Sequence, residues 1–287
     1  MHEMRTHPTS REPLQGGFSL LELAIVLVIS GIILNYGLKT TMAYAESESR
    51  NITRDRIAAI EEALVLFASR QKRLPCPADT SLGETSTSNG LEQLATAGNT
   101  TTCKVGIQYS AVPWRDLGIS QEVALDGWRR KITYRADDGA TGVTRPNGVD
   151  MKNCQASGTN PQTATTDCSA VLPFHRPTAF LSGKGLTIHN GDASVKLMDP
   201  AAISGSGGAA FVLVSHGKDG SGAYLTSGAR LPLPSTSQAA QADNVDDASD
   251  FADAPRNENT GSSAYFDDLV LRRSIDWVAV RAGLGSQ

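Results

Sequence analysis

The sequence predicts an α+β protein in which a long N-terminal helix packs against a mainly antiparallel β-sheet domain with long loops. Two observations carry this prediction. Apolar residues run almost unbroken over residues 18–38 and then recur at helical spacing, with no proline between them and Pro75. Short segments with strand character, separated by turn-forming residues, follow over the rest of the chain.

The segment from Phe18 to Leu38 has the length and composition of a membrane-spanning helix. Glu22 is its single charged residue, and as a helix it would be about 30 Å long, which matches the hydrocarbon core of a bilayer. A secretory signal peptide is the alternative, but its apolar region is shorter, at about 7–15 residues, and a small-residue cleavage site follows it. No such site follows Leu38, so we expect a retained helix.

The helix is predicted to continue over residues 39–73 as an amphipathic segment. The apolar positions are Ile57, Ile60, Leu64 and Phe67, which are three or four residues apart. Charged residues lie between them, as in an amphipathic helix. The sequence Leu74-Pro75-Cys76-Pro77 ends the helix, because each proline lacks a donor and disfavours helix in the residue before it. One half of the helix would then lie in lipid while the other half carries a domain.

Residues 74–287 are predicted to form that domain. Residues 80–102 and 139–168 are rich in small polar residues and are expected to be loops. A turn at Asp126-Gly127 leads into a strand that places Ile132 and Tyr134 on one face. Further strands are predicted at 179–181, 186–189, 210–215 and 269–271.

Composition excludes several classes of function. The net charge is −4, so no basic excess exists to neutralise nucleic acid. The hydrophobic share of 40% and the charged share of 20% argue against a disordered chain and against a multi-span membrane protein. No Walker, zincin or G-x-S-x-G spacing is present. We therefore expect a protein that is not an enzyme and requires no cofactor, with structural or surface roles for His175, His189 and His216.

One short motif precedes the apolar run. The residues Gly17-Phe18-Ser19-Leu20-Leu21-Glu22 closely resemble the N-terminal processing and methylation motif of type IV pilins and type II secretion pseudopilins. The resemblance implies that a membrane peptidase cuts between Gly17 and Phe18, removes residues 1–17 as a leader and methylates the new amine of Phe18. It also implies that Glu22 pairs with the amine of a neighbouring subunit when the helices bundle into a filament.

The same resemblance implies a structural, minor subunit of a type IV pilus or type II secretion pseudopilus. Its partners would be other pilin or pseudopilin subunits, the prepilin peptidase and methyltransferase, and an inner-membrane assembly platform. The chain would cross the inner membrane once, with residues 74–287 in the periplasm. The segments LPCPAD, PW-x-x-LG, D-x-W, FVLVSHGKDGSGAY and YFDDLV also resemble a subgroup of minor pilin-like proteins, although ordinary turns and core aromatics are the alternative explanation.

A membrane-anchored periplasmic enzyme or binding module is the competing hypothesis. Such a protein would use the helix only as a tether. A tether needs length and apolar character, but it needs neither Gly17-Phe18 nor Glu22. These residues therefore favour the filament subunit.

The four cysteines, Cys76, Cys103, Cys154 and Cys168, form an even set without C-x-x-C spacing. In a domain outside the cytoplasm they are expected to be oxidised. Three pairings are open. The pairing 76–103 with 154–168 is preferred, because each bond would close one loop-like region.

Acidic residues near the C-terminus raise the question of a calcium site. The segments at 215–220 and 266–270 are similar to the part of major pseudopilins that holds Ca²⁺. Carboxylates for such a site would come from Asp219, Asp267 and Asp268, with Asp243, Asp246, Asp247 and Asp250 nearby in sequence. Acidic turn residues in a solvated loop are the alternative.

Overall fold

The first helix, α1, extends over Leu20–Gln71, as the apolar pattern predicts. The computed structural model describes residues 19–95, 102–151, 181, 183–202, 207–246, 249–259 and 261–285. The chain divides into two compact units, Met1–Ser47 and Glu48–Gln287. The boundary between the units lies within α1, and each unit is described below by itself.

In the first unit, the apolar side chains of α1 are exposed. Leu20 is 90% exposed and Leu34 is 66% exposed. Among the described residues, α1 is the one helix long and apolar enough to cross a membrane by length and composition, and none of its most apolar window is buried. Such a surface is stable only against lipid or other apolar helices, because in water it costs about 25 cal/mol per Å².

In the second unit, α1 packs its predicted stripe into the main hydrophobic core. Ile60 and Leu64 are fully buried, Ile57 is 6% exposed, and Phe67 packs partly buried against the same cluster. This confirms the amphipathic segment. The helix ends at Gln71, before the prolines. The next residue, Lys72, adopts a left-handed conformation with φ of 58°, which does not continue a right-handed helix. The Lys72 side chain forms an ion pair with Asp150 at 3.0 Å.

A five-stranded antiparallel sheet packs against this half of α1. Its strand order is β1-β2-β4-β7-β10. The bounds in that order are Ala78–Asp79, Tyr109–Ala111, Thr133–Ala136, Ala209–Ser215 and Leu269–Ser274. The strand β7, which lies between β4 and β10, is buried along its whole length, which explains its continuous apolar sequence.

The two faces of β7 serve two separate cores. Phe211 and Leu213 pack in the cluster that contains the α1 stripe. Val212 and Val214 pack in a second cluster with Ile188 and other apolar residues. Since neighbouring side chains on a strand point to opposite faces, α1 covers one face of the sheet and the elements around Ile188 cover the other.

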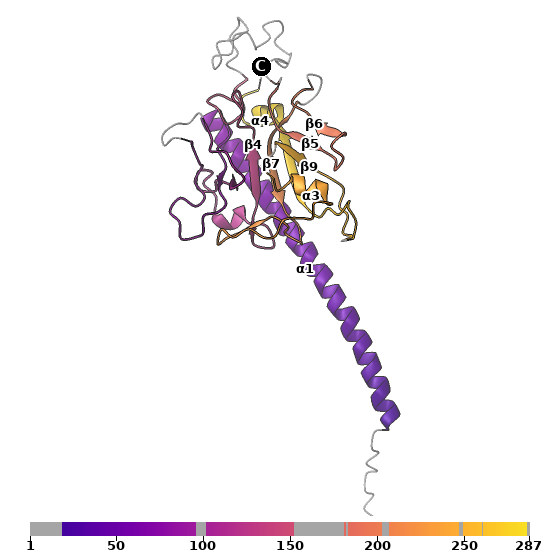
Figure 1. Ribbon diagram of the computed structural model, residues 1–287. Helices are drawn as coiled ribbons and strands as arrows, with labels where there is room; N and C mark the ends of the chain where they lie inside the picture. The colour runs from indigo at the N-terminus through magenta and orange to yellow at the C-terminus, as the bar shows by residue number, and fades with distance from the viewer. Residues whose placement is uncertain are drawn as a thin grey trace, which may run out of the picture. The chain divides into compact units, whose positions relative to one another are not determined.

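Those elements are a small three-stranded sheet and a short helix. The sheet has the order β6-β5-β9, with β5 parallel to β9, and Figure 1 shows it together with α3 on one side of β7. A two-stranded sheet, β3-β8, lies elsewhere in the domain. The remaining bounds are β3 Arg130–Lys131, β5 Thr187–His189, β6 Lys196–Met198, β8 Tyr224–Leu225, β9 Asp250–Ala252, η1 Gln121–Ala124, α3 Ala239–Asp243 and α4 Ile275–Arg281.

The predicted fold class is confirmed, together with the strands at 186–189, 210–215 and 269–271, and Ile132 and Tyr134 are both fully buried. The strand predicted at 179–181 is wrong at Leu181, its one described residue, which is helical and packs in the main core. An apolar residue such as Leu181 can be buried in a helical as well as in an extended conformation, so its apolar character alone does not predict a strand.

Candidate functional site

The N-terminal segment is the first candidate site, and its described part begins at Ser19. The Ser19 backbone N donates to Glu22 Oε2 at 2.9 Å, and the Glu22 backbone N donates to Ser19 Oγ at 3.2 Å. This reciprocal pair is a capping box at the start of α1. Gly17 and Phe18 lie outside the described residues.

The capping box gives Glu22 a local partner that the sequence analysis missed. Its signature, Ser or Thr followed three residues later by Glu, is present in Ser19-Leu20-Leu21-Glu22. The carboxylate is held beside the backbone N of Ser19, one residue after Phe18.

The segments D-x-W, SHGKDG and YFDDLV meet in one buried polar network. Asp126 Oδ1 accepts from the backbone N of Trp128 at 2.9 Å and of Arg130 at 2.8 Å, and its Oδ2 accepts from Ser215 Oγ at 2.9 Å. The Arg130 guanidinium continues the network by donating to the Gly217 carbonyl. Burial raises the pKa of Asp126 even though the charge of Arg130 lowers it. These contacts hold the turn after β7 against the turn before β3.

The predicted calcium ligands are also brought together. Asp267 Oδ2 accepts from the backbone N of Lys218 at 2.7 Å and of Asp219 at 3.0 Å, and Asp267 Oδ1 accepts from Gln241 Nε2 at 2.8 Å. Asp268 Oδ2 accepts from Asn244 Nδ2 at 2.8 Å. Asp243, Asp246 and Asp250 lie at α3 and β9, and Asp247 lies outside the described residues.

The donor set around these acids fits a network of hydrogen bonds better than a cation. Both oxygens of Asp267 already accept from N–H groups, which would have to turn away before Ca²⁺ could bind there. Within the described part of the chain, no group of three or more His, Cys, Asp or Glu side chains has the arrangement of a metal site. Burial raises the pKa of Asp267 and raises that of Asp268 well above its usual value. The calcium site stays a prediction.

His216 connects this network to β4. Its Nε2 lies 2.9 Å from Thr133 Oγ1, and its Nδ1 lies 4.0 Å from Asp268 Oδ2. This order of hydroxyl, imidazole and carboxyl resembles that of a nucleophilic triad. However, burial lowers the pKa of His216 to about 3, and the adjoining cavity is about 10 Å³, the space of one water molecule. The arrangement has no room for a substrate beside Thr133.

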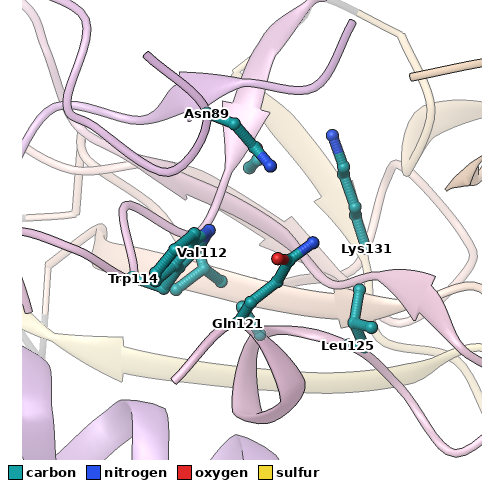
Figure 2. Close-up of a pocket in the computed structure, with 8 residues that line it drawn as sticks. Asn89, Val112, Trp114, Gln121, Leu125 and Lys131 are labelled. Atoms are coloured by element: carbon teal, nitrogen blue, oxygen red, sulfur yellow. The ribbon is translucent and has the colours of Figure 1, made fainter. Parts of the chain in front are cut away.

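A second small cavity lies near Lys131. Figure 2 shows the side chains of Trp114, Gln121 and Lys131 around it. Burial lowers the pKa of Lys131 to about 8, while its Nζ donates to the carbonyls of Thr80 and Leu82 at 2.8 and 2.6 Å. The cavity is also about 10 Å³. Lys131 therefore holds the loop at 80–82 in place.

The disulfide that the structure describes is Cys76–Cys103, with Cα atoms 5.4 Å apart. This confirms the first of the two preferred bonds. Cys154 and Cys168 lie outside the described residues, so the second bond stays a prediction.

Comparison with known protein families gives one match. The family model described as the prokaryotic N-terminal methylation motif matches residues 13–34, a range that contains Gly17, Phe18 and Glu22. Neither curated proteins nor solved structures give a match. The matched residues include the start of the exposed apolar part of α1, which suits anchoring in the inner membrane. The chain thus carries the prepilin-type N-terminal methylation motif of type IV pilins and pseudopilins.

Proposed function

We propose that this protein is a structural, minor subunit of a type IV pilus or type II secretion pseudopilus. The prepilin peptidase would cut after Gly17 and methylate Phe18. The mature chain would stay in the inner membrane, with its β-rich domain in the periplasm, until an assembly platform adds it to a filament of pilin-like subunits. The methylation motif that matches residues 13–34 is the observation that carries this proposal.

The exposed apolar part of α1 supports assembly through the helix. Apolar side chains surround it on all sides, as in a helix that is surrounded by lipid or by other helices. A subunit that moves from lipid into a filament exchanges one apolar environment for another. The same apolar surface can therefore be stable in the membrane and in the filament.

Glu22 is the feature that a simple membrane anchor does not need. A carboxylate at the centre of a membrane helix costs about 2.5 kcal/mol or more. Glu22 lies instead in the first turn of α1, where its carboxylate accepts a hydrogen bond from the Ser19 backbone N. This position and this contact reduce the cost. Cleavage after Gly17 would create a positive amine one residue before Ser19. Pairing of Glu22 with this amine on a neighbouring subunit would set the axial position of each helix in the filament.

Three variants separate processing, capping and pairing. Gly17→Val should leave the leader uncut, because the peptidase cleft would not admit a branched side chain there. Glu22→Ala should be cleaved but should enter filaments poorly. Glu22→Gln is the matched control, because glutamine retains the capping box but removes the charge.

Cleavage is read from the mass of the membrane-bound protein, and assembly from its amount in sheared filaments. If charge pairing drives assembly, Glu22→Gln should be as defective as Glu22→Ala. Normal assembly of Glu22→Gln together with defective Glu22→Ala would assign Glu22 to helix capping alone. Normal assembly of both variants would contradict any assembly role for Glu22.

A further inference from the structure

The four cysteines of the chain can pair in three ways, and chain length alone selects weakly among them. Cys76 bonds to Cys103 across 27 residues, whereas Cys154 lies almost three times as far along the chain from Cys76. The entropy of loop closure depends weakly on loop length, so this difference favours Cys103 only about fivefold. A selective pairing therefore needs groups that hold the two cysteines together before the bond forms.

The backbone at Cys76 is held by two side chains. The fully buried Tyr134 donates its hydroxyl hydrogen to the Pro75 carbonyl at 3.0 Å. The backbone N of Cys76 donates to Glu92 Oε2 at 3.1 Å. Glu92 therefore contacts the cysteine itself, and Tyr134 contacts the residue before it.

The short segment that begins at Glu92 also pairs with the chain beside both cysteines. The backbone N of Gln93 donates to the Pro77 carbonyl at 3.1 Å. The Gln93 carbonyl accepts from the backbone N of Lys104 at 2.9 Å. Pro77 follows the first cysteine of the bond, and Lys104 follows the second. Glu92 and its neighbour therefore connect the two sides of the bond without using the sulfur atoms.

Glu92 is itself fixed by Arg73, two residues after the end of α1. Arg73 Nη1 donates to Glu92 Oε2 and Arg73 Nη2 donates to Glu92 Oε1, each at 2.9 Å. The two side chains are only 7% and 15% exposed, and the Arg73 guanidinium lies over the Phe67 ring of α1. Two parallel, charge-assisted hydrogen bonds fix the direction of the carboxylate as well as its distance. The end of α1 therefore sets the place at which Glu92 meets Cys76.

We propose that Glu92 is a positioning residue for oxidation of the cysteines. It holds Cys76 beside Cys103 and so selects this bond over bonds to Cys154 or Cys168. The inference concerns the folding of the domain, and it holds whether or not the chain enters a filament.

The oxidant in this reaction is a second disulfide, such as oxidised glutathione. One cysteine thiolate attacks it, which forms a mixed disulfide and releases one glutathione thiol. The other cysteine thiolate then attacks the protein sulfur of the mixed disulfide, and the second glutathione leaves as a thiol. The cysteine pair loses two electrons and two protons, which the two glutathione molecules gain. Glu92 acts on the second step by raising the effective concentration of the two thiols.

Equilibration of the full-length protein in detergent with reduced and oxidised glutathione tests the proposal. Alkylation and peptide mapping give the fraction of the Cys76–Cys103 bond at each ratio, and hence the effective concentration of the two thiols. Glu92→Ala should lower this concentration about tenfold, because it removes a hydrogen bond to a charged group. During oxidation of the reduced variant, Cys76 should also become linked to Cys154 or Cys168. An unchanged effective concentration would overturn the proposal.

Glu61→Ala is the matched control. Glu61 also pairs with an arginine, Arg273, and its side chain is 14% exposed, close to the 15% of Glu92. Its partner lies in β10 instead of beside Cys76. Glu61→Ala should leave the effective concentration unchanged even where the melting temperature falls. An equal loss in both variants would assign the effect to general destabilisation and would overturn the proposal.

Two further variants complete the test. Glu92→Gln keeps an oxygen that accepts from the Cys76 backbone N, so it should retain most of the effective concentration, and a loss equal to that of Glu92→Ala would contradict a direct hold on Cys76. The double variant Arg73→Met with Glu92→Ala leaves no unpaired buried charge, so it replaces Glu92→Ala if the single variant does not fold. It should show the same loss, and the effective concentration of the unaltered protein in this variant would overturn the proposal.

Discussion

Asp268 has a pKa that is set by its surroundings. It lies immediately before β10, buried between Asn244 and His216. Burial raises its pKa well above the usual value, while burial lowers the pKa of His216 to about 3. Burial therefore favours the neutral form of both groups, because an unpaired charge is costly in the protein interior.

Asp268→Asn should make the protein less sensitive to rising pH. The folded state holds the proton of Asp268 more tightly than the unfolded state, whose pKa is about 3.9. Stability is therefore fully present below that pH and is lost as the pH rises through the folded-state pKa. Asparagine carries no charge and keeps an oxygen for Asn244, so the variant should gain in melting temperature relative to the unaltered protein as the pH rises from 4 to 8.

Thermal unfolding of the two proteins in detergent, with a chelator present in every sample, measures this difference. A melting-temperature difference that stays constant over the pH range would show that Asp268 is ionised in the folded protein. Repeating the series with millimolar calcium tests the predicted metal site separately. Calcium should raise the melting temperature of the unaltered protein only if the metal binds the folded state preferentially.

At the scale of elements, the second half of α1 is the main support of the sheet. Leu64 is fully buried in the main core, whereas Leu66, two residues later, is 50% exposed. Leu64→Ala should lower the free energy of unfolding by about 2–5 kcal/mol, because it leaves a cavity in a packed core. Leu66→Ala should change it by less than about 0.5 kcal/mol. Equal losses in denaturant unfolding would contradict the packing of α1 described above.

The Cys76–Cys103 bond is the second support at this scale. It joins the end of the α1 segment to the loop before β2, across 27 residues. Replacing both cysteines by serine should lower the free energy of unfolding by about 3.5 kcal/mol in the chain-entropy model. Peptide mapping without reduction checks the connectivity, and a Cys76 peptide linked to Cys154 or Cys168 would show that the pairing is wrong.

Strong local patterns explain which elements the sequence predicts. α1 has apolar residues at helical spacing, β7 has a continuous apolar run and β10 begins with one, and the structure confirms all three elements. β1, β8 and β9 are two or three residues long, too short for any periodicity to be visible. Their pairing depends on distant neighbours, which a single sequence does not reveal.

The same reasoning applies to the sites. The methylation motif and the Ser19–Glu22 capping box are local, so both can be read from the sequence. A groove in the Glu48–Gln287 unit is lined by Arg54 in α1 together with Arg256 and Arg273 near the C-terminus. No spacing rule connects such positions. Only the packing of α1 beside β10 reveals the groove.

At the scale of the whole molecule, the account assigns different tasks to the two parts of the chain. The exposed apolar part of α1 provides the anchor in the membrane and the contact within a filament. The Glu48–Gln287 unit provides a folded domain built on the five-stranded sheet. Both assignments depend on conversion of the precursor to the mature chain.

The mass of the N-terminal peptide of the protein isolated from membranes tests this central claim most directly. The account predicts a peptide that begins at Phe18 and carries one methyl group on its amine, with residues 1–17 absent. The same measurement on Gly17→Val should return the complete precursor. A chain from the unaltered protein that begins at Met1, or at any residue other than Phe18, would contradict the account.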